Sequence, residues 1–412
     1  MAELFARLPQ FSPSPVLATT ITVHYVKVKI MEVSLAEAAQ TMEQHYQRQD
    51  FSALATLAKE ITQQRPEQPA AWRFLGIAAL LSGGDGETPM LQAALLGDAE
   101  AKVWLNVLGE FLYYPKKTFV FGDLKNQVSC MWMRKSAYME YPAEVHIETL
   151  AICNAKCSFC PYPTMDRQGD KMPDTLIDKI INDLKAIPAD MPFTICPFKV
   201  NDPFLDKRIF SVLDKINKEL PNASLRLFTN GSPLTENIVE KIAAVRNVAN
   251  LWISLNESEE NAYEATMQLP FNKTIEKLDK LHKCVEAGYP HPVIVSRVAD
   301  RSHADEAFQH FIAKRYPLFK CFMIKRDNWT GQVDTGFEKR VPPTACLRWY
   351  ELSIMASGKV ALCCMDGEGK HVIGDVNSQS VLEIYRSPEY RKLRQYSFSR
   401  LAAAMPCAEC DY

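Results

Sequence analysis

Apolar positions change their spacing along the chain, and each spacing predicts a different kind of element. From residue 34 to about 114 they recur every three or four positions, as at Leu54, Ala58 and Ile61, which indicates amphipathic helices. From residue 141 onward, short apolar runs alternate with helical patterns. The predicted strands are 144–152, 193–196, 224–228, 250–255, 292–298 and 319–324, and the helices between them are 175–187, 208–220, 235–243, 271–287 and 303–313. This order predicts an α/β fold, a parallel sheet or partial barrel with helices outside and functional sites at the carboxyl ends of the strands.

The two ends of the chain follow other patterns. Residues 1–34 are mixed in character and contain a strand-like run at 21–30. The residues from Trp72 to Gly76 resemble the Trp-x-x-Leu-Gly signature of tetratricopeptide repeats, and an ordinary helical domain is the alternative. Near the C-terminus, 351–355 and 359–363 predict a hairpin, and 381–401 a helix. The expected segments are an N-terminal extension (1–34), a helical tetratricopeptide-like domain (35–135), a barrel (136–335) and a small C-terminal domain (336–412).

Charge and composition narrow the function classes. The 412 residues include 47 basic and 49 acidic side chains, for a net charge of −2. This balance argues against binding to nucleic acid or to a membrane surface, because both need a clustered basic face. No apolar stretch approaches the ~20 residues of a membrane-spanning helix, and residues 1–30 lack the pattern of a secretory signal. We therefore expect a cytoplasmic protein, in which twelve cysteines indicate metal binding or redox chemistry rather than disulfides.

Three of these cysteines, here called the cysteine triad, form a compact motif after the first predicted strand. Cys153, Cys157 and Cys160 are spaced as Cys-x3-Cys-x2-Cys, and cysteine thiolates are ligands of zinc and of iron–sulfur clusters. A four-iron cluster needs four ligands, so three cysteines would leave one iron open to a small molecule. The alternatives are a structural zinc completed by His146, a disulfide, and plain buried cysteines.

The triad, with Phe159 before its last cysteine, resembles the signature of radical S-adenosylmethionine (SAM) enzymes. The resemblance implies a partial (β/α)6 TIM-like barrel in which the triad holds a 4Fe–4S cluster. The open iron would bind the amino and carboxylate groups of SAM. One electron would then cleave SAM to methionine and a 5′-deoxyadenosyl radical, which abstracts hydrogen from the substrate. A flavodoxin- or ferredoxin-type reductant is implied as well.

The same resemblance implies SAM contacts at the ends of successive strands. Asp202 lies where the family has a Gly-Glu-Pro motif and keeps its negative charge, and Asn230 lies in a Thr-Asn-Gly sequence similar to that of the family. Arg297 ends a strand and would pair with the SAM carboxylate through its planar guanidinium. The implied SAM contacts are Phe159, Asp202, Asn230, Ser254, Asn256 and Arg297. No residue is assigned as catalytic.

A second set, here called the cysteine quartet, lies in the C-terminal segment. It consists of Cys346, Cys363, Cys407 and Cys410. Four cysteinates suit zinc and an iron–sulfur cluster equally. With the turn and strand at 357–363, the quartet resembles the SPASM domain of radical SAM enzymes in its shortened Twitch form, which implies one auxiliary 4Fe–4S cluster. Cys364 is the alternative to Cys363, since adjacent strand residues point to opposite faces.

These features predict a radical SAM enzyme. A fully cysteine-ligated auxiliary cluster has no open position for substrate and would therefore carry electrons. We expect oxidation, dehydrogenation or cross-linking of a small sugar-like molecule or a peptide. Redox-neutral epimerisation or rearrangement is an alternative reaction, and a zinc-binding helical scaffold is an alternative of another class. The helical domain would offer a groove for a peptide or a partner protein, and neither nucleic acid nor a membrane is expected as a partner.

Overall fold

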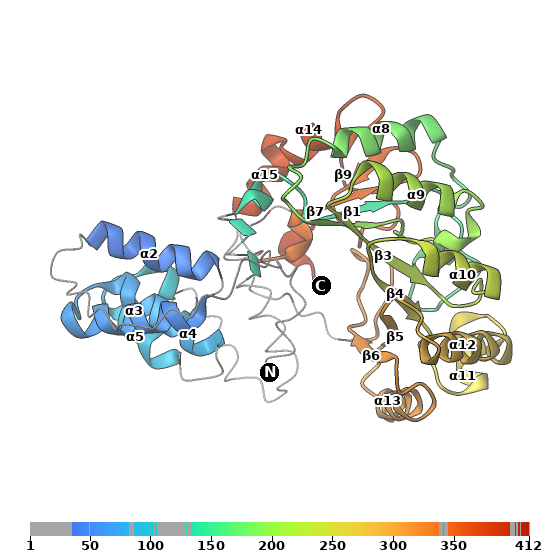
Figure 1. The fold of residues 1–412 in the computed structure, drawn as a ribbon, viewed down its shortest axis with the longest axis horizontal. Coiled ribbons are helices and arrows are strands. Elements are labelled where there is room, and N and C mark those ends of the chain that lie inside the picture. Colours follow the sequence, from blue (N-terminus) through green and yellow to red (C-terminus); the bar gives the residue numbers. More distant parts are fainter. Residues whose placement is uncertain are drawn as a thin grey trace, which may run out of the picture. The chain divides into compact units, whose positions relative to one another are not determined.

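The computed structural model describes residues 35–48, 50–81, 86–102, 104, 129–130, 133–134, 136–337, 341, 345–395, 400, 403 and 405–411. The chain divides into two compact units, residues 1–117 and 118–412 (Figure 1). The expected boundary at residue 135 therefore lies within the second unit. The predicted strand at 21–30 lies outside the described residues.

The described part of the first unit is helical. Its longer helices are α2 (Leu35–Gln47), α3 (Phe51–Gln64), α4 (Pro69–Leu81) and α5 (Glu87–Leu95). Helix α3 begins where the side chain of Asp50 accepts a hydrogen bond from the amide of Ala53 at 3.0 Å, which satisfies one of the free amides of the first turn. Leu54, Ala58 and Ile61 are buried, as their spacing predicts. The N-terminal helical region is thus confirmed.

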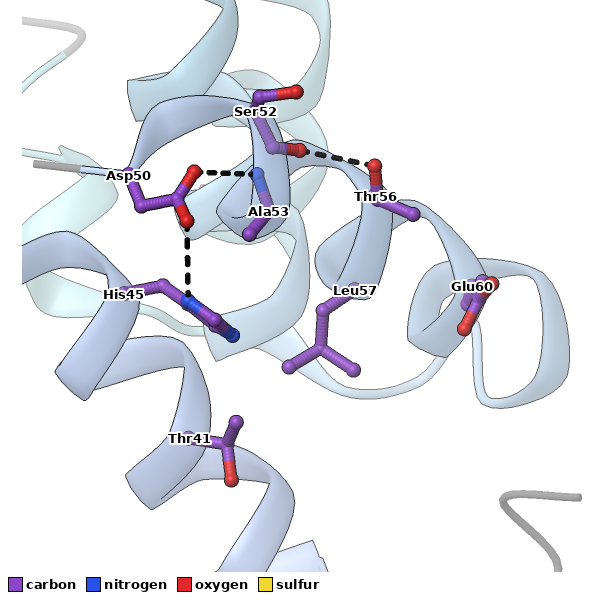
Figure 2. A pocket seen from close by; sticks show the side chains of 8 residues that line it. All are labelled: Thr41, His45, Asp50, Ser52, Ala53, Thr56, Leu57 and Glu60. Carbon is purple, nitrogen blue, oxygen red and sulfur yellow. Dashed lines mark hydrogen bonds and ion pairs between the residues drawn. The ribbon is translucent and has the colours of Figure 1, made fainter. Parts of the chain in front are cut away.

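A pocket of about 560 Å³ opens between α2 and α3 (Figure 2). It is lined by Thr41, His45, Asp50, Ser52, Ala53, Thr56, Leu57 and Glu60. Nδ1 of His45 lies 4.0 Å from Oδ2 of Asp50. None of the residues predicted to hold SAM or a cluster lines this pocket, so the candidate active site has to be sought in the second unit.

The second unit is built on a parallel sheet, as predicted. Its first six strands are β1 (Glu144–Ile147), β2 (Phe193–Cys196), β3 (Ala223–Thr229), β4 (Val248–Ser254), β5 (Val293–Val298) and β6 (Lys320–Ile324). Each pairs in parallel with the next, which gives the order β6-β5-β4-β3-β2-β1. Parallel pairing brings all six carboxyl ends to one edge, and that is where ligand sites form in such folds.

The C-terminal segment extends the same sheet beyond β1. Its strands are β7 (Glu351–Ile354), β8 (Lys359–Ala361) and β9 (Val372–Asp375). Strand β7 pairs in parallel with β1, and β8 and β9 continue the sheet in antiparallel order. The predicted hairpin is confirmed. Strand β1 leads into the cysteine triad and β8 leads to Cys363, so the triad loop and one quartet cysteine both follow strands of the same sheet. Figure 1 shows β1 and β7 side by side.

Helices follow the strands and bury one face against the sheet. They are α8 (Asp174–Leu184), α9 (Ile209–Glu219), α10 (Glu236–Ala244), α11 (Glu260–Met267), α12 (Phe271–Glu286) and α13 (His303–Arg315). In α8, buried Leu176, Ile177, Ile180, Ile181 and Leu184 repeat at three and four positions, which is the period of a helix packed on one side. Strand β3 alternates buried and partly exposed positions, as expected for a strand.

Two features of the second unit differ from the sequence prediction. Helix α11 was not predicted, because only Tyr263 and Met267 of its eight residues are buried, too few for a visible period. The single helix predicted at 381–401 is wrong. The described residues form α14 (Val381–Tyr385) and α15 (Pro388–Gln395), since Pro388 lacks the amide that would continue the first helix. Within the described ranges, no helix has the length and apolar character needed to cross a bilayer.

Candidate active site

The cysteine triad lies in the loop that follows β1, at the carboxyl edge of the sheet. Burial raises the pKa of the Cys153 thiol to about 11 and that of Cys160 to about 12. Burial also raises the pKa of Cys157, and the thiols of Cys160 and Cys153 add to this rise, so the three sulfurs lie close enough to interact. A cationic metal centre would bind them as thiolates. This set of neighbouring sulfur donors fits an iron–sulfur cluster.

Helix α11 supports the triad loop from behind. The amide of Lys156 donates to the carbonyl of Met267 at 3.0 Å. The Met267 thioether sulfur lies 3.4 Å from the Cys157 sulfur and 3.1 Å from Nδ2 of Asn256. Met267 is buried. It thus connects a cysteine of the triad to the end of β4, and no sequence signal indicated this role.

Asp202 and Asn230 lie together beside the triad. Oδ2 of Asp202 accepts hydrogen bonds from the Thr229 hydroxyl at 2.8 Å and from the Asn230 amide at 2.9 Å, and Oδ1 accepts from the Phe204 amide at 3.2 Å. Nδ2 of Asn230 points to the Cys153 sulfur at 3.8 Å. Burial raises the pKa of Asp202 to about 6. Asp202 therefore ties the ends of β2 and β3 together next to the triad, and its contact with SAM stays a prediction.

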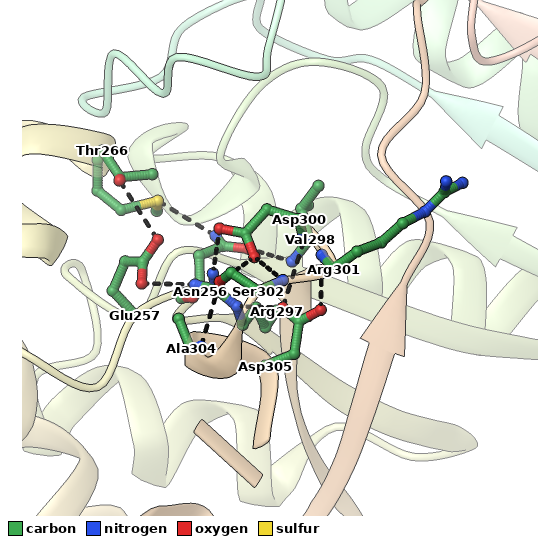
Figure 3. Close-up of polar contacts among 11 residues, drawn as sticks. Asn256, Glu257, Thr266, Arg297, Val298, Asp300, Arg301, Ser302, Ala304 and Asp305 are labelled. Carbon is green, nitrogen blue, oxygen red and sulfur yellow. Dashed lines mark hydrogen bonds and ion pairs between the residues drawn. The ribbon is translucent and has the colours of Figure 1, made fainter. Parts of the chain in front are cut away.

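Arg297 is enclosed by acidic side chains at the end of β5 (Figure 3). Its guanidinium forms an ion pair with Glu257, and it lies 2.7 Å from the carboxylate of Asp300 and 2.8 Å from that of Asp305. Its side chain is 1% exposed. One cation among three carboxylates leaves a net negative group, which disfavours a further carboxylate. This arrangement does not favour the predicted pairing of Arg297 with the SAM carboxylate, which stays a prediction.

The observed role of Arg297 is to shape the turn after β4. Its guanidinium donates to the Asn256 carbonyl, and Oδ1 of Asn256 accepts from the Val298 amide at 2.9 Å. Asn256 has a φ of 66°, a left-handed conformation that asparagine tolerates better than most residues. Ser254, the last residue of β4, lies just before Asn256 in the sequence, and its side chain is partly exposed. The carbonyl of Phe159 accepts a hydrogen bond from the Trp329 indole at 3.1 Å.

A buried polar network inside the sheet was missed by sequence analysis. Nε2 of His146 on β1 lies 3.0 Å from Glu144 and 3.4 Å from Glu351 of β7. Its Nδ1 is hydrogen-bonded to the Phe198 carbonyl at 3.0 Å, and Arg226 of β3 pairs with Glu144 at 2.6 Å. Both ring nitrogens are thus engaged away from the triad, which argues against His146 as a zinc ligand there.

The ionisation of His146 gives a testable pH dependence. Burial alone would lower its pKa, but hydrogen bonds to Glu144 and Glu351 outweigh burial and raise the pKa to about 10. An unfolded imidazole ionises near about pH 6.5, so the charged ring stabilises the fold fully below that pH and loses this contribution as pH rises toward 10. The difference in free energy of unfolding between wild type and His146→Gln, measured by urea denaturation, should therefore shrink with rising pH. A constant difference would contradict this assignment.

The quartet cysteines come from the start of a short 3-10 helix (Leu347–Tyr350), the segment after β8, and the end of the chain. Burial raises the pKa of Cys346 to about 11, and the Cys410 thiol adds to the rise. Cys363 interacts with the thiols of Cys364, Cys346 and Cys410, whereas the charged neighbours of Cys364 include His146. The Cys364 sulfur lies within 4.8 Å of the ligand atoms of His146 and Glu351 and so belongs to the inner network, which favours Cys363 as the quartet ligand. Four buried or half-buried thiols fit an iron–sulfur cluster.

Two family models match this chain. The model described as the radical SAM superfamily matches residues 147–312, and the SPASM model, described as an iron-sulfur cluster-binding domain, matches residues 346–411. The chain carries a radical SAM domain followed by a SPASM domain. The radical SAM domain implies SAM and a SAM-binding 4Fe–4S cluster, and the SPASM domain implies auxiliary iron–sulfur clusters. Neither model covers the tetratricopeptide-like segment, which stays a prediction, as does the single auxiliary cluster of the Twitch form.

Solved structures resemble this radical SAM and SPASM chain at low sequence identity. Streptococcus suis SuiB bound to precursor peptide SuiA has a TM-score of 0.51 and 12% identity, covering 79% of this chain and 87% of SuiB. BtrN in complex with AdoMet and 2-DOIA has a TM-score of 0.46 and 15% identity, covering 66% of this chain and 93% of BtrN. The anSMEcpe structure with bound AdoMet has a TM-score of 0.48 and 13% identity, covering 63% and 81%. The likeness to SuiB supports the fold.

Proposed function

We propose that this chain is a radical SAM oxidoreductase that removes two electrons from a carbon centre of its substrate. The triad would hold the SAM-binding cluster, and the quartet would hold one auxiliary cluster. The observation that carries this proposal is the parallel pairing of β7 with β1, which joins the quartet segment to the strand that precedes the triad. A closed set of four thiolates suits electron transfer, because it leaves no position for substrate.

The proposed reaction removes the two electrons in two one-electron steps. One electron from a flavodoxin- or ferredoxin-type reductant cleaves SAM to methionine, and the adenosyl fragment takes one hydrogen atom from the substrate to become 5′-deoxyadenosine. The substrate then loses one proton and one electron, and this electron leaves through the auxiliary cluster to the same class of carrier. Net, SAM is consumed and the substrate is oxidised by two electrons. An alcohol would give a carbonyl, and two suitably placed groups of a peptide would give a cross-link.

The assignment of SAM contacts follows from the edge of the sheet that the triad occupies. Asn230, Ser254 and Asn256 lie at or next to the ends of β3 and β4, and Asn230 also reaches Cys153. We assign these three side chains, with Phe159 of the triad loop, to SAM. Asp202 stays a further proposed SAM contact and also holds Asn230 in position, and Arg297 holds Asn256 in position.

Redox-neutral epimerisation is the second candidate, and it is favoured by two buried thiols. The Cys196 thiol donates to Oε1 of Glu144 at 3.3 Å, and the Cys364 sulfur belongs to a group with His146 and Glu351 whose ligand atoms all lie within 4.8 Å. A thiol in the sheet interior would return a hydrogen atom to a substrate radical, and the thiyl radical left behind would regain one electron from the same class of reductant and one proton from solvent. In that case the substrate would keep its oxidation state.

Isotope labelling distinguishes the two reactions. The anaerobic holoenzyme would be incubated with SAM, reductant and deuterated candidates of both expected classes, amino sugars and peptides. Oxidation should give deuterium in 5′-deoxyadenosine and a product two mass units lighter than the unlabelled substrate. A parallel incubation would use unlabelled substrate in D2O. Deuterium from the solvent at the product carbon, with no other change in mass, would overturn oxidation in favour of epimerisation. The same series run with residues 1–117 deleted tests whether the helical unit docks the peptide class.

A further inference from the structure

Trp349 donates a hydrogen bond to a quartet sulfur. Its indole Nε1 lies 3.5 Å from the sulfur of Cys407, and the side chain is 1% exposed. The Trp349 amide donates to the carbonyl of Cys346 at 3.2 Å, so the short helix that starts after Cys346 also places the indole. A buried indole N–H requires an acceptor, and here the acceptor is a proposed cluster ligand.

Lys199 brings a buried positive charge to the same group. Lys199 is 1% exposed and is among the largest fully buried side chains of the described residues. Its Nζ donates to the Ser353 hydroxyl at 3.0 Å and to the Cys363 carbonyl at 3.3 Å. Both acceptors are neutral, and the nearby carboxylate of Glu148 is already ion-paired with Arg167. A buried ammonium requires a compensating negative charge. Four cysteinates around an iron–sulfur cluster would supply that charge.

Arg400 adds a second buried cation. It is 2% exposed, and its guanidinium donates to the carbonyls of Ala345 at 3.1 Å and Cys410 at 3.4 Å. Ala345 precedes the first quartet cysteine, and Cys410 is the last. The quartet therefore has one N–H donor on a sulfur and two buried cations against the backbone of its ligands.

We propose that Trp349 and Lys199 raise the reduction potential of the auxiliary cluster and so make it the acceptor of the substrate's electron. This inference rests on the proposed function, in which the substrate radical is oxidised by one electron, releases one proton, and reduces the cluster by one electron. Reduction adds negative charge to the cluster. A hydrogen bond to a ligand sulfur and a nearby cation stabilise that added charge, and both are known determinants of cluster potential.

The test isolates the auxiliary cluster before measuring it. Cys153, Cys157 and Cys160 are replaced by alanine, and the reduced fraction of the remaining cluster is followed by electron paramagnetic resonance during a redox titration. Trp349→Phe keeps the ring and removes the N–H, and Lys199→Met keeps the length and removes the charge. Each should lower the midpoint potential, reducing the ratio of reduced to oxidised cluster at a fixed potential by about tenfold, or about 59 mV for a one-electron couple.

Matched controls separate this effect from general damage. Trp329→Phe removes an indole N–H that is bound to the Phe159 carbonyl instead, and Lys179→Met removes a partly exposed lysine paired with Asp183. Neither should shift the midpoint. Unchanged potentials in Trp349→Phe and Lys199→Met would overturn the inference, and if Lys199→Met holds no cluster, Trp349→Phe decides. A triad-free protein without any second iron–sulfur cluster would instead overturn the proposed function.

Discussion

Replacing Cys153, Cys157 and Cys160 together by alanine is expected to abolish reductive cleavage of SAM while the C-terminal cluster remains. The three thiols lie in one loop at the carboxyl edge of the sheet, and burial, together with the thiols of Cys160 and Cys153, raises the pKa of Cys157. Without them no cluster can present an open iron to SAM. The measurement is chromatographic detection of 5′-deoxyadenosine after anaerobic incubation with SAM and dithionite. Its formation should fall below detection, and the iron content should fall by about four per chain.

The matched control for this variant is Cys284→Ala. Cys284 is exposed and lies on α12, outside both cysteine sets. Its replacement should leave the iron content and 5′-deoxyadenosine formation unchanged. Retention of SAM cleavage by the triad variant would show that the triad does not hold the reactive cluster.

Replacing Arg297 by methionine is expected to destabilise the second unit by about 3–5 kcal/mol, the cost of breaking a buried ion pair by removing one partner. The change leaves Glu257 and Asp305, with side-chain exposures of 14% and 19%, without their cation. It also removes the donor to the Asn256 carbonyl. Urea denaturation followed by circular dichroism measures the loss. Because Asn256 is a proposed SAM contact, the affinity for SAM should fall as well.

Arg315→Met is the control for the loss of an ion pair as such. Arg315 pairs with Asp279 at 2.7 Å, and their side chains are 44% and 37% exposed. Exposed pairs contribute about 1 kcal/mol or less, so this variant should remain near wild-type stability. Equal losses in Arg297→Met and Arg315→Met would mean that the enclosure of Arg297 has no special structural role.

The barrel could be predicted from sequence because its signals are local. Apolar periodicity over a single element marks α8 and β3, and the triad lies within eight consecutive residues after β1. A motif of this kind can be recognised without knowing which distant segments contact one another in the fold. The quartet was also recognisable, because its CxxC and hairpin spacings are short-range patterns.

The remaining features depend on contacts between distant segments. His146 meets Glu351 only because β7 joins the sheet beside β1, and Met267 reaches Cys157 only because α11 turns back toward the triad loop. Arg297 was interpreted as a SAM ligand because a guanidinium at a strand end suits a carboxylate. The acidic residues that surround it come from the segments after β4 and β5 and from the first turn of α13, and only the folded arrangement shows that they satisfy it.

The most direct test of the central claim is metal analysis of the anaerobically purified chain, combined with an assay for 5′-deoxyadenosine. We expect a brown protein with about eight irons, four for each of two clusters, that forms 5′-deoxyadenosine when SAM and a reductant are supplied. A colourless protein with stoichiometric zinc and no SAM cleavage would contradict the account and favour a zinc-binding scaffold.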